Sequence, residues 1–247
     1  MVEKDLRGRR ALITGASSGI GRKTAEEFAA RGADVAVASR REDVLKELAE
    51  TLENEADIEA LAVEMDVTDE TQVARGVSSI VDAFGGLDIV VNNAGIGCGG
   101  PITQVSTEEY RSVMSVNVDG MFFVTRETMP HLLDSEGALL FVGSTSGRYP
   151  RPDYPIYAAS KWWTRGFALS IAGQAGEDGV AVTLINPGTT RTDFGSSFRA
   201  SNTEKYDAGE ALDPKDVAET IAFAAKQEAP TTISELAVTM RDSLSNT

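Results

Sequence analysis

The sequence predicts an α/β protein built on one parallel sheet with helices on both faces. Short apolar runs alternate with longer segments of helical periodicity along the whole chain, which is the pattern of βα units. The runs are nearly continuous and rich in β-branched residues, as expected for strands that are covered on both sides. A glycine-rich turn follows the first run directly. These observations predict a doubly wound, Rossmann-type sheet of about seven strands in a single domain, residues 1–247.

The same pattern places each element. The expected strands are residues 11–13, 35–38, 61–63, 89–91, 139–142, 180–185 and 236–238. The expected helices are residues 19–31, 41–54, 69–84, 107–133, 155–176 and 214–226. Three of the helices have recognisable start signals, at Asp69, Thr107 and Pro214. The irregular stretch 188–212 is longer than a routine connection, and we expect it to be a substrate lid.

Composition excludes several classes of function. A net charge of -15 argues against nucleic-acid and acidic-membrane partners, which bind basic surfaces. This acidity fits either an ordinary acidic enzyme or one adapted to high salt. With one cysteine, Cys98, and one histidine, His131, neither an internal disulfide nor a metal site built on several such ligands is expected. The N-terminus lacks an apolar signal segment and no run is long enough to span a membrane, so we expect a cytoplasmic protein.

The turn after the first expected strand indicates a dinucleotide site. It reads Thr14-Gly15-Ala16-Ser17-Ser18-Gly19-Ile20-Gly21 and opens a helix, whose amide groups and dipole would receive a pyrophosphate. The spacing differs from the usual dinucleotide fingerprint, and a purely structural tight turn is the alternative.

The second expected strand indicates which cofactor binds. It ends at Ser39-Arg40-Arg41, without the carboxylate that would hold the ribose hydroxyls of NAD. Since Arg40 can clamp a 2′-phosphate and Ser39 can donate to it, the sequence favours NADP(H) over NAD(H). The alternative is that both arginines are solvated charges at the start of the next helix.

Three further residues describe a hydride-transfer site. Tyr157 and Lys161 lie four residues apart and so share one face of the expected helix 155–176. A fixed cation favours the phenolate and lowers the pKa of a tyrosine from about 10. Ser144, thirteen residues before Tyr157, would donate to a substrate oxygen. Alone, the Tyr-Lys pair also fits a helix with one half-buried aromatic and one solvated lysine.

A series of ordered motifs resembles that of the compact short-chain dehydrogenases/reductases, across essentially the whole chain. They are Thr14 to Gly21 (TGxxxGxG), Asn92 to Gly95 (NNAG), the set Asn117, Ser144, Tyr157 and Lys161, and Pro187-Gly188 with Thr192 (PGxxxT). The resemblance implies a catalytic role for Asn117, Ser144, Tyr157 and Lys161, with Asn117 holding a water in a proton relay.

The resemblance also implies a set of cofactor contacts. Asp66 and Val67 would bind the adenine, and Thr192 and the backbone near Thr189 would hold the nicotinamide carboxamide. The full expected set is Gly15, Ser17, Ser18, Gly19, Ile20, Gly21, Ser39, Arg40, Arg41, Asp66, Val67, Asn93, Ala94, Gly95, Tyr157, Lys161, Pro187, Gly188, Thr189, Thr190 and Thr192. No metal is expected.

Other residues near these motifs have plainer interpretations. Cys98 is expected to be a small buried hydrophobic residue, and His131 a surface or helix-end residue. The segment between Ser144 and Tyr157 either contacts the substrate or packs as an ordinary loop, through Arg148, Tyr149, Asp153 and Tyr154. The expected lid contains Phe194 and Phe198, which either cover an apolar substrate or do not contact it.

Trp162 and Trp163 point about 100° apart on a helix, so one of them is expected to pack inside. In the family this helix pairs with its copy in another subunit, which implies a homodimer or homotetramer.

The sequence therefore predicts an NADP(H)-dependent oxidoreductase that acts on a carbonyl or secondary alcohol of a small molecule. The segment Ile233 to Val238 resembles the branch with 3-hydroxy acid and serine dehydrogenases more than the acyl-carrier-protein ketoreductases, which are a less favoured interpretation. A catalytically idle NADP(H)-binding regulator is a second rival. A sugar-nucleotide epimerase or dehydratase is a third, and for it the chain lacks a larger C-terminal domain.

Overall fold

The computed structural model describes residues 5–195 and 200–241 and contains one seven-stranded sheet. The strand order is β3-β2-β1-β4-β5-β6-β7, and all pairings are parallel. The strands are β1 (Arg10–Thr14), β2 (Asp34–Ser39), β3 (Ala60–Glu64), β4 (Ile89–Asn92), β5 (Ala138–Val142), β6 (Ala181–Pro187) and β7 (Glu235–Val238). The predicted fold class and the seven predicted strands are confirmed.

The helices alternate with these strands. They are α1 (Gly19–Ala30), α2 (Glu42–Glu55), α3 (Glu70–Phe84), α4 (Thr107–Met114), α5 (Met121–Ser135), α6 (Pro155–Ala175), α7 (Asn202–Lys205) and α8 (Pro214–Ala225), with a π-helical turn at Ser115–Gly120 and a 3₁₀ turn at Thr145–Gly147. Asp69 caps α3 by accepting hydrogen bonds from Thr71 N and Gln72 N, as its sequence signal predicts. Pro214 lies in the first turn of α8.

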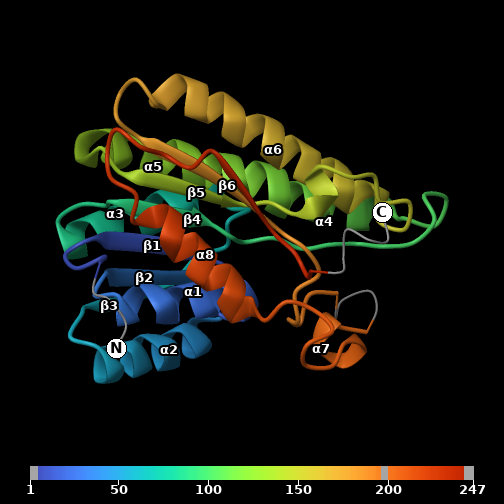
Figure 1. The fold of residues 1–247 in the computed structure, drawn as a ribbon, viewed down its shortest axis with the longest axis horizontal. Coiled ribbons are helices and arrows are strands. Elements are labelled where there is room, and N and C mark those ends of the chain that lie inside the picture. The colour runs from blue at the N-terminus through green and yellow to red at the C-terminus, as the bar shows by residue number, and fades with distance from the viewer. Residues whose placement is uncertain (1–4, 196–199, 242–247) are drawn as a thin grey trace.

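The sheet separates two apolar cores, one on each face. Figure 1 shows the helices that cover the sheet on both sides. Helices α1, α2 and α8 cover one face, where Phe28, Leu48 and Ile221 are fully buried or nearly so. Helices α3, α5 and α6 cover the other, with Ile80 and Leu132 at its centre. Since each strand is buried from both sides, its residues need not alternate between apolar and polar.

The predicted helix 107–133 begins at the predicted residue, Thr107, after the N-cap Ser106, whose side chain forms a capping box with Glu109. The prediction of one regular α-helix is wrong, because a π-helical turn at Ser115–Gly120 adds a residue to the turn that carries Asn117. Hydrophobic periodicity does not reveal such an insertion.

An ion pair joins β1 and β4 at their amino ends. Arg10, the first residue of β1, donates through Nε and Nη2 to Asp88, just before β4, over 2.6 and 2.9 Å. Burial alone raises the pKa of the Asp88 carboxyl, but the hydrogen bonds from Arg10 outweigh it and hold the pKa below its usual value. This pair lies at the opposite end of the strands from the glycine turn, which follows the end of β1.

The segment 188–212 is anchored at its base. Arg191 N donates to Leu212 O, and Leu212 N donates to Thr189 O. The short helix α7 lies within the segment, and Figure 1 shows it apart from the two helical layers. Phe198 lies outside the described residues.

Among residues 5–195 and 200–241, none of the helices combines the length and apolarity that crossing a bilayer requires. The cytoplasmic location stays a prediction.

Candidate active site

The glycine turn packs directly against the segment after β4. A Cβ atom at Gly21 would lie 2.5 Å from both Asn93 Nδ2 and Gly15 O, and one at Gly15 would lie 2.9 Å from Ala94 Cα. Gly15 also has a φ of 67°, in the left-handed region that favours glycine. These glycines are therefore required by the close approach of the two segments.

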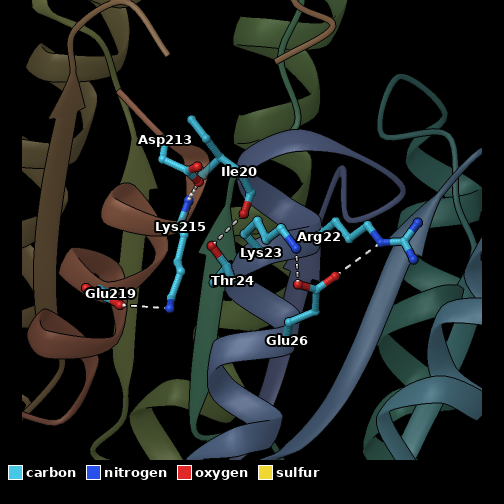
Figure 2. A network of polar contacts seen from close by, with 8 residues as sticks. All are labelled: Ile20, Arg22, Lys23, Thr24, Glu26, Asp213, Lys215 and Glu219. Carbon is cyan, nitrogen blue, oxygen red and sulfur yellow. Dashed lines mark hydrogen bonds and ion pairs between the residues drawn. The ribbon is translucent and has the colours of Figure 1, made fainter. Parts of the chain in front are cut away.

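The start of α1 leaves its amide groups without a side-chain cap. Ser18 is the N-cap residue but makes no capping bond, and the first turn contains no acidic residue. Figure 2 shows Arg22 and Lys23 both held by Glu26, one turn further along, beside the capped start of α8 at Asp213. An uncapped helix N-terminus of this kind suits a phosphate group.

A cleft of about 620 Å³ opens at the carboxyl ends of β2, β3 and β4. It is lined by Arg40, Asp66, Thr68, Ile96, Thr107, Glu108, Arg111, Ser112, Ser115 and Val116. The strand order reverses between β1 and β4, and α/β sheets bind ligands at this switch point. Arg111 and its neighbours on α4 were not predicted, because only the tertiary fold brings that helix to the cleft.

The predicted cofactor residues after β2 and β3 divide between the cleft and the interior. Arg41 reaches back to the glycine turn, donating to Ser17 Oγ through Nε and Nη2 at 3.1 and 2.9 Å. Ser39 Oγ accepts from Arg41 N. Asp66 lines the cleft, whereas Val67 is buried against Gly120 of the π-helical turn.

The segment after β4 holds the turn in place. Asn93 Nδ2 donates to Thr14 O at 2.8 Å and to Gly15 O at 3.3 Å. Gly95 lies beside the catalytic candidates, since a Cβ atom there would be 3.4 Å from Asn117 Oδ1 and 3.6 Å from Lys161 Nζ. Asn93 therefore supports the turn backbone, and Gly95 keeps the space next to Lys161 open.

Asn117 is fully buried and its side chain has three partners. Oδ1 accepts from Ile96 N at 2.9 Å, and Nδ2 donates to Ile96 O at 2.8 Å and to Ser160 Oγ at 3.0 Å. Ser160 Oγ in turn donates to Tyr157 O. Asn117 thus ties the π-helical turn to α6 at the level of Tyr157.

Ser144, Tyr157 and Lys161 converge at the carboxyl end of β5. Ser144 lies two residues beyond the end of β5, and a hydrogen bond with its side chain lowers the pKa of the Tyr157 phenol. Lys161 is buried, donates to Val142 O at 2.9 Å, and has its ammonium 5.8 Å from the centre of the Tyr157 ring. The structure thus brings together the residues that the sequence separates by up to seventeen positions.

Burial acts in opposite directions on the two ionisable groups. It raises the pKa of the Tyr157 phenol, while the hydrogen bond with Ser144 and the charge of Arg151 lower it by less. Burial lowers the pKa of Lys161 to about 8. The expectation that Lys161 would lower the Tyr157 pKa is not met here, because desolvation dominates and the ammonium is turned toward Val142.

Phe194, from the expected lid, covers this centre. Its ring lies 5.2 Å from that of Tyr157, and a Cβ atom at Gly97 would lie 2.6 Å from Phe194 Cζ. Cys98 next to it is buried, as expected, and burial raises the pKa of its thiol. Gly97 therefore makes room for the aromatic ring above the tyrosine.

The remaining expected cofactor contacts lie where β6 ends and the segment 188–212 begins. Thr192 packs on the glycine turn, since a Cβ atom at Gly19 would be 3.1 Å from Thr192 Cγ2. Gly188 N donates to Val238 O, and Thr190 Oγ1 to Gly188 O.

The wall between Ser144 and Tyr157 contributes one residue that the motifs did not indicate. Arg151 donates to Thr145 Oγ1 at 3.3 Å, and its charge acts on Tyr157. Tyr149 is exposed, while Asp153 accepts from Gly100 N through its backbone carbonyl. Arg151 therefore adds a positive charge at the edge of the site.

The two tryptophans separate as expected. Trp163 stacks on Phe167 with ring centres 4.6 Å apart and packs against the core, whereas 47% of Trp162 is exposed. His131 is partly buried in the last two turns of α5.

These residues fit a dinucleotide. The uncapped start of α1, the glycines that admit a close backbone approach and the cleft with Arg40 meet the requirements for a pyrophosphate, an adenine and a ribose.

Comparison with known proteins agrees with a dinucleotide site. Residues 9–203 match the family model for short chain dehydrogenases. The chain is 32% identical to the glycine betaine reductase ATRR of Emericella nidulans over 96% of its own length, but it spans only 19% of that protein.

Solved structures match nearly end to end. An alcohol dehydrogenase from Thermococcus sibiricus, complexed with 5-hydroxy-NADP, superposes with a TM-score of 0.88 at 26% identity, covering 94% of this chain and 97% of that one. A 3-ketoacyl-(acyl-carrier-protein) reductase from Brucella melitensis, complexed with NADH, gives 0.86 at 33% identity, with 96% and 99% covered. A serine dehydrogenase complexed with NADP+ gives 0.86 at 27%, with 93% and 94% covered.

The family match, the parallel sheet and the nicotinamide cofactors of these neighbours agree, and this chain belongs to the short-chain dehydrogenase/reductase family of oxidoreductases.

Proposed function

We propose that this protein is an NADP(H)-dependent oxidoreductase that interconverts a carbonyl and a secondary alcohol on a small molecule. The observation that carries the proposal is the convergence of Ser144, Tyr157 and Lys161 beside the glycine turn. A bound nicotinamide would supply the hydride in reduction and accept it in oxidation.

The side chains handle the proton and the developing charge. In reduction, Ser144 and Tyr157 donate hydrogen bonds to the carbonyl oxygen as negative charge grows on it, and Tyr157 releases its proton to that oxygen. The raised pKa of Tyr157 keeps the phenol protonated at neutral pH, as this role requires. Lys161, with a pKa of about 8, is mainly an ammonium at neutral pH, and its Nζ lies 5.8 Å from the centre of the Tyr157 ring. Asn117 fixes the π-helical turn against α6 and so supports both residues.

The proposed preference for NADP(H) rests on two arginines. Arg40 lines the cleft and Arg41 lies over Ser17 of the glycine turn, so two guanidinium groups flank the place where the adenosine ribose would lie. Both can bind a 2′-phosphate with charge-assisted hydrogen bonds.

The proposed substrate is an anionic hydroxy acid or its keto form, such as a 3-hydroxy acid. Among the described residues no ion pair of Arg151 with a carboxylate is seen, although Arg151 lies at the edge of the site and is held by Thr145. A cation that is positioned but not neutralised suits a substrate carboxylate. The segment 188–212, with Phe194 over Tyr157, is proposed as the lid that closes on this substrate.

The proposed oligomer forms through α5 and α6. A groove of about 490 Å³ between them is lined by apolar side chains that include Phe122, Met129 and Phe167. Phe122, Leu133, Trp162 and Leu169 are the large apolar residues that these helices expose. An apolar surface of this kind suits a symmetric contact with a second copy in a homodimer or homotetramer.

The catalytic assignment is tested by Tyr157→Phe. We expect NADPH binding to stay nearly intact while kcat falls roughly 10²-fold or more, because the proton donor is lost. Cofactor binding is followed by fluorescence titration and turnover by NADPH consumption across keto acids, neutral ketones and 3-oxoacyl thioesters. Near-normal turnover in the variant would contradict the role of Tyr157, and a wild-type protein that binds NADPH without turnover on any of these substrates would favour the idle regulator.

The cofactor preference is tested by Arg40→Asp. The variant should lower the ratio of NADPH to NADH affinity by about tenfold or more, since a charge-assisted hydrogen bond contributes roughly 1.5–3 kcal/mol. Dissociation constants for both cofactors measure this ratio without turnover. Arg75→Asp, the same charge change at an exposed position on α3, is the control and should leave the ratio unchanged. An unchanged ratio in Arg40→Asp would count against the assignment.

The substrate class is tested by Arg151→Gln. We expect KM for a 3-hydroxy acid to rise about tenfold or more, because the charged partner of the carboxylate is removed. KM for a neutral secondary alcohol of the same chain length should hardly change. For the acid, the KM of Arg151→Lys should lie between those of wild type and Arg151→Gln. Equal effects on the acid and the neutral alcohol would remove the argument for an anionic substrate.

The oligomeric state is tested by light scattering at assay concentration. The measured mass should be two or four times the 26.3 kDa of one chain, and Phe122→Glu should shift it toward one chain by placing a charge in the apolar contact. An active wild-type monomer would overturn the proposal.

A further inference from the structure

The backbone at Ser144 is held by a side chain from the neighbouring strand. Ser144 N donates to Oδ1 of Asn186 at 3.2 Å, and Asn186, near the end of β6, is only 1% exposed. The contact needs the glycine that precedes the serine, because a Cβ atom at Gly143 would lie 2.5 Å from the same Oδ1 atom. The position of Ser144 therefore depends on which way the Asn186 amide faces.

Glu235 determines the orientation of that amide. Asn186 Nδ2 donates to Glu235 Oε1 at 2.8 Å. An ionised carboxylate accepts hydrogen bonds and donates none, so only the amino end of Asn186 can face it. The carbonyl end must then face Ser144. If the amide were reversed, its oxygen would face the Glu235 carboxylate, which only accepts hydrogen bonds. Its amino group would then face Ser144 N, which only donates.

Two arginines hold the Glu235 carboxylate in place. Arg165 on α6 donates to both of its oxygens at 3.1 Å, and Arg148, from the wall after Ser144, lies 3.8 Å away. The hydrogen bond from Arg165 is the main cause that keeps the pKa of Glu235 below its usual value. Glu235 thus stays ionised at neutral pH and connects β7, β6 and α6.

We propose that Glu235 is a positioning residue, which fixes the Ser144 hydroxyl at the reaction centre through Asn186. The proposal rests on the proposed catalytic role of Ser144. Glu235 itself touches neither the tyrosine nor the expected cofactor residues in the contacts described above, so its effect on turnover passes through the serine. Misplacing a catalytic group by about 1 Å can lower a rate roughly 10²-fold.

The first test compares Glu235→Ala and Glu235→Gln with wild type. In the alanine variant kcat should fall roughly 10- to 100-fold, while the dissociation constant of NADPH stays within about twofold. Glutamine still offers an oxygen to Asn186 Nδ2 but can also rotate to donate, so its kcat should lie between wild type and alanine. Unchanged kcat in both variants would overturn the proposal.

The pH profile separates positioning from general support of the fold. The hydrogen bond with Ser144 lowers the pKa of Tyr157, so a displaced serine lets that pKa rise. For alcohol oxidation, in which Tyr157 acts as the base, the rise of kcat with pH should therefore move to higher pH in both Glu235 variants. An unmoved profile would count against a serine-mediated effect.

Asp88→Asn is the matched control. It breaks the ion pair with Arg10 at the amino ends of β1 and β4, away from the proposed site. It should therefore lower the melting temperature without changing kcat or its pH profile. If Asp88→Asn alters both as much as the Glu235 variants do, the effect of Glu235 is structural and the proposal is wrong.

A double-mutant cycle with Ser144→Ala completes the test. Because Glu235 acts through the serine hydroxyl, adding Glu235→Gln to Ser144→Ala should cause little further loss of kcat. Full additivity would overturn the proposal. A wild-type protein without turnover would instead contradict the proposed function, and the two failures are thereby distinguished.

Discussion

The junction of β1 and β4 is the contact on which the rest of the site depends. Thr14 Oγ1 accepts from the backbone N–H groups of both Asn93 and Ala94 and donates to Val91 O, while the Asn93 amide binds the turn at Thr14 and Gly15. These hydrogen bonds fix the glycine turn against the segment that carries Gly95 and Ile96. Ile96 then holds Asn117, and Asn117 holds α6 through Ser160. One network thus connects the expected cofactor residues with the proposed catalytic residues.

Glycine positions, where a side chain is missing, are as necessary to this network as the hydrogen-bonding residues. Gly15 and Gly21 let two backbones meet, Gly97 admits the Phe194 ring, and Gly143 lets Asn186 reach Ser144. In each case a Cβ atom would lie within 3.0 Å of its neighbour, and at Gly15 and Gly21 the neighbouring atoms include backbone, so a larger residue there would displace the main chain. The glycines of the TGxxxGxG turn are therefore required by sterics.

The sequence predicts the elements better than it predicts their partners. All seven strands follow from local apolar runs, and Tyr157 and Lys161 follow from helical spacing. The π-helical turn at Asn117 escapes prediction because one inserted residue barely alters a hydrophobic pattern. Contacts between distant positions leave no local signal either. Asn186 and Glu235 are 49 residues apart, and Arg41 meets Ser17 across 24, so only the folded chain reveals them.

Burial affects the two directions of the proposed reaction differently, if Tyr157 is its acid and base. It raises the Tyr157 pKa and lowers that of Lys161, since both neutral forms are favoured when water is removed. A protonated phenol is ready to donate, which suits reduction. Oxidation needs the phenolate, and burial opposes this form unless nearby groups compensate. The hydrogen bond with Ser144 and the charge of Arg151 are the two influences that do so here. The residues that we propose to position the serine would therefore also affect how readily Tyr157 forms the phenolate.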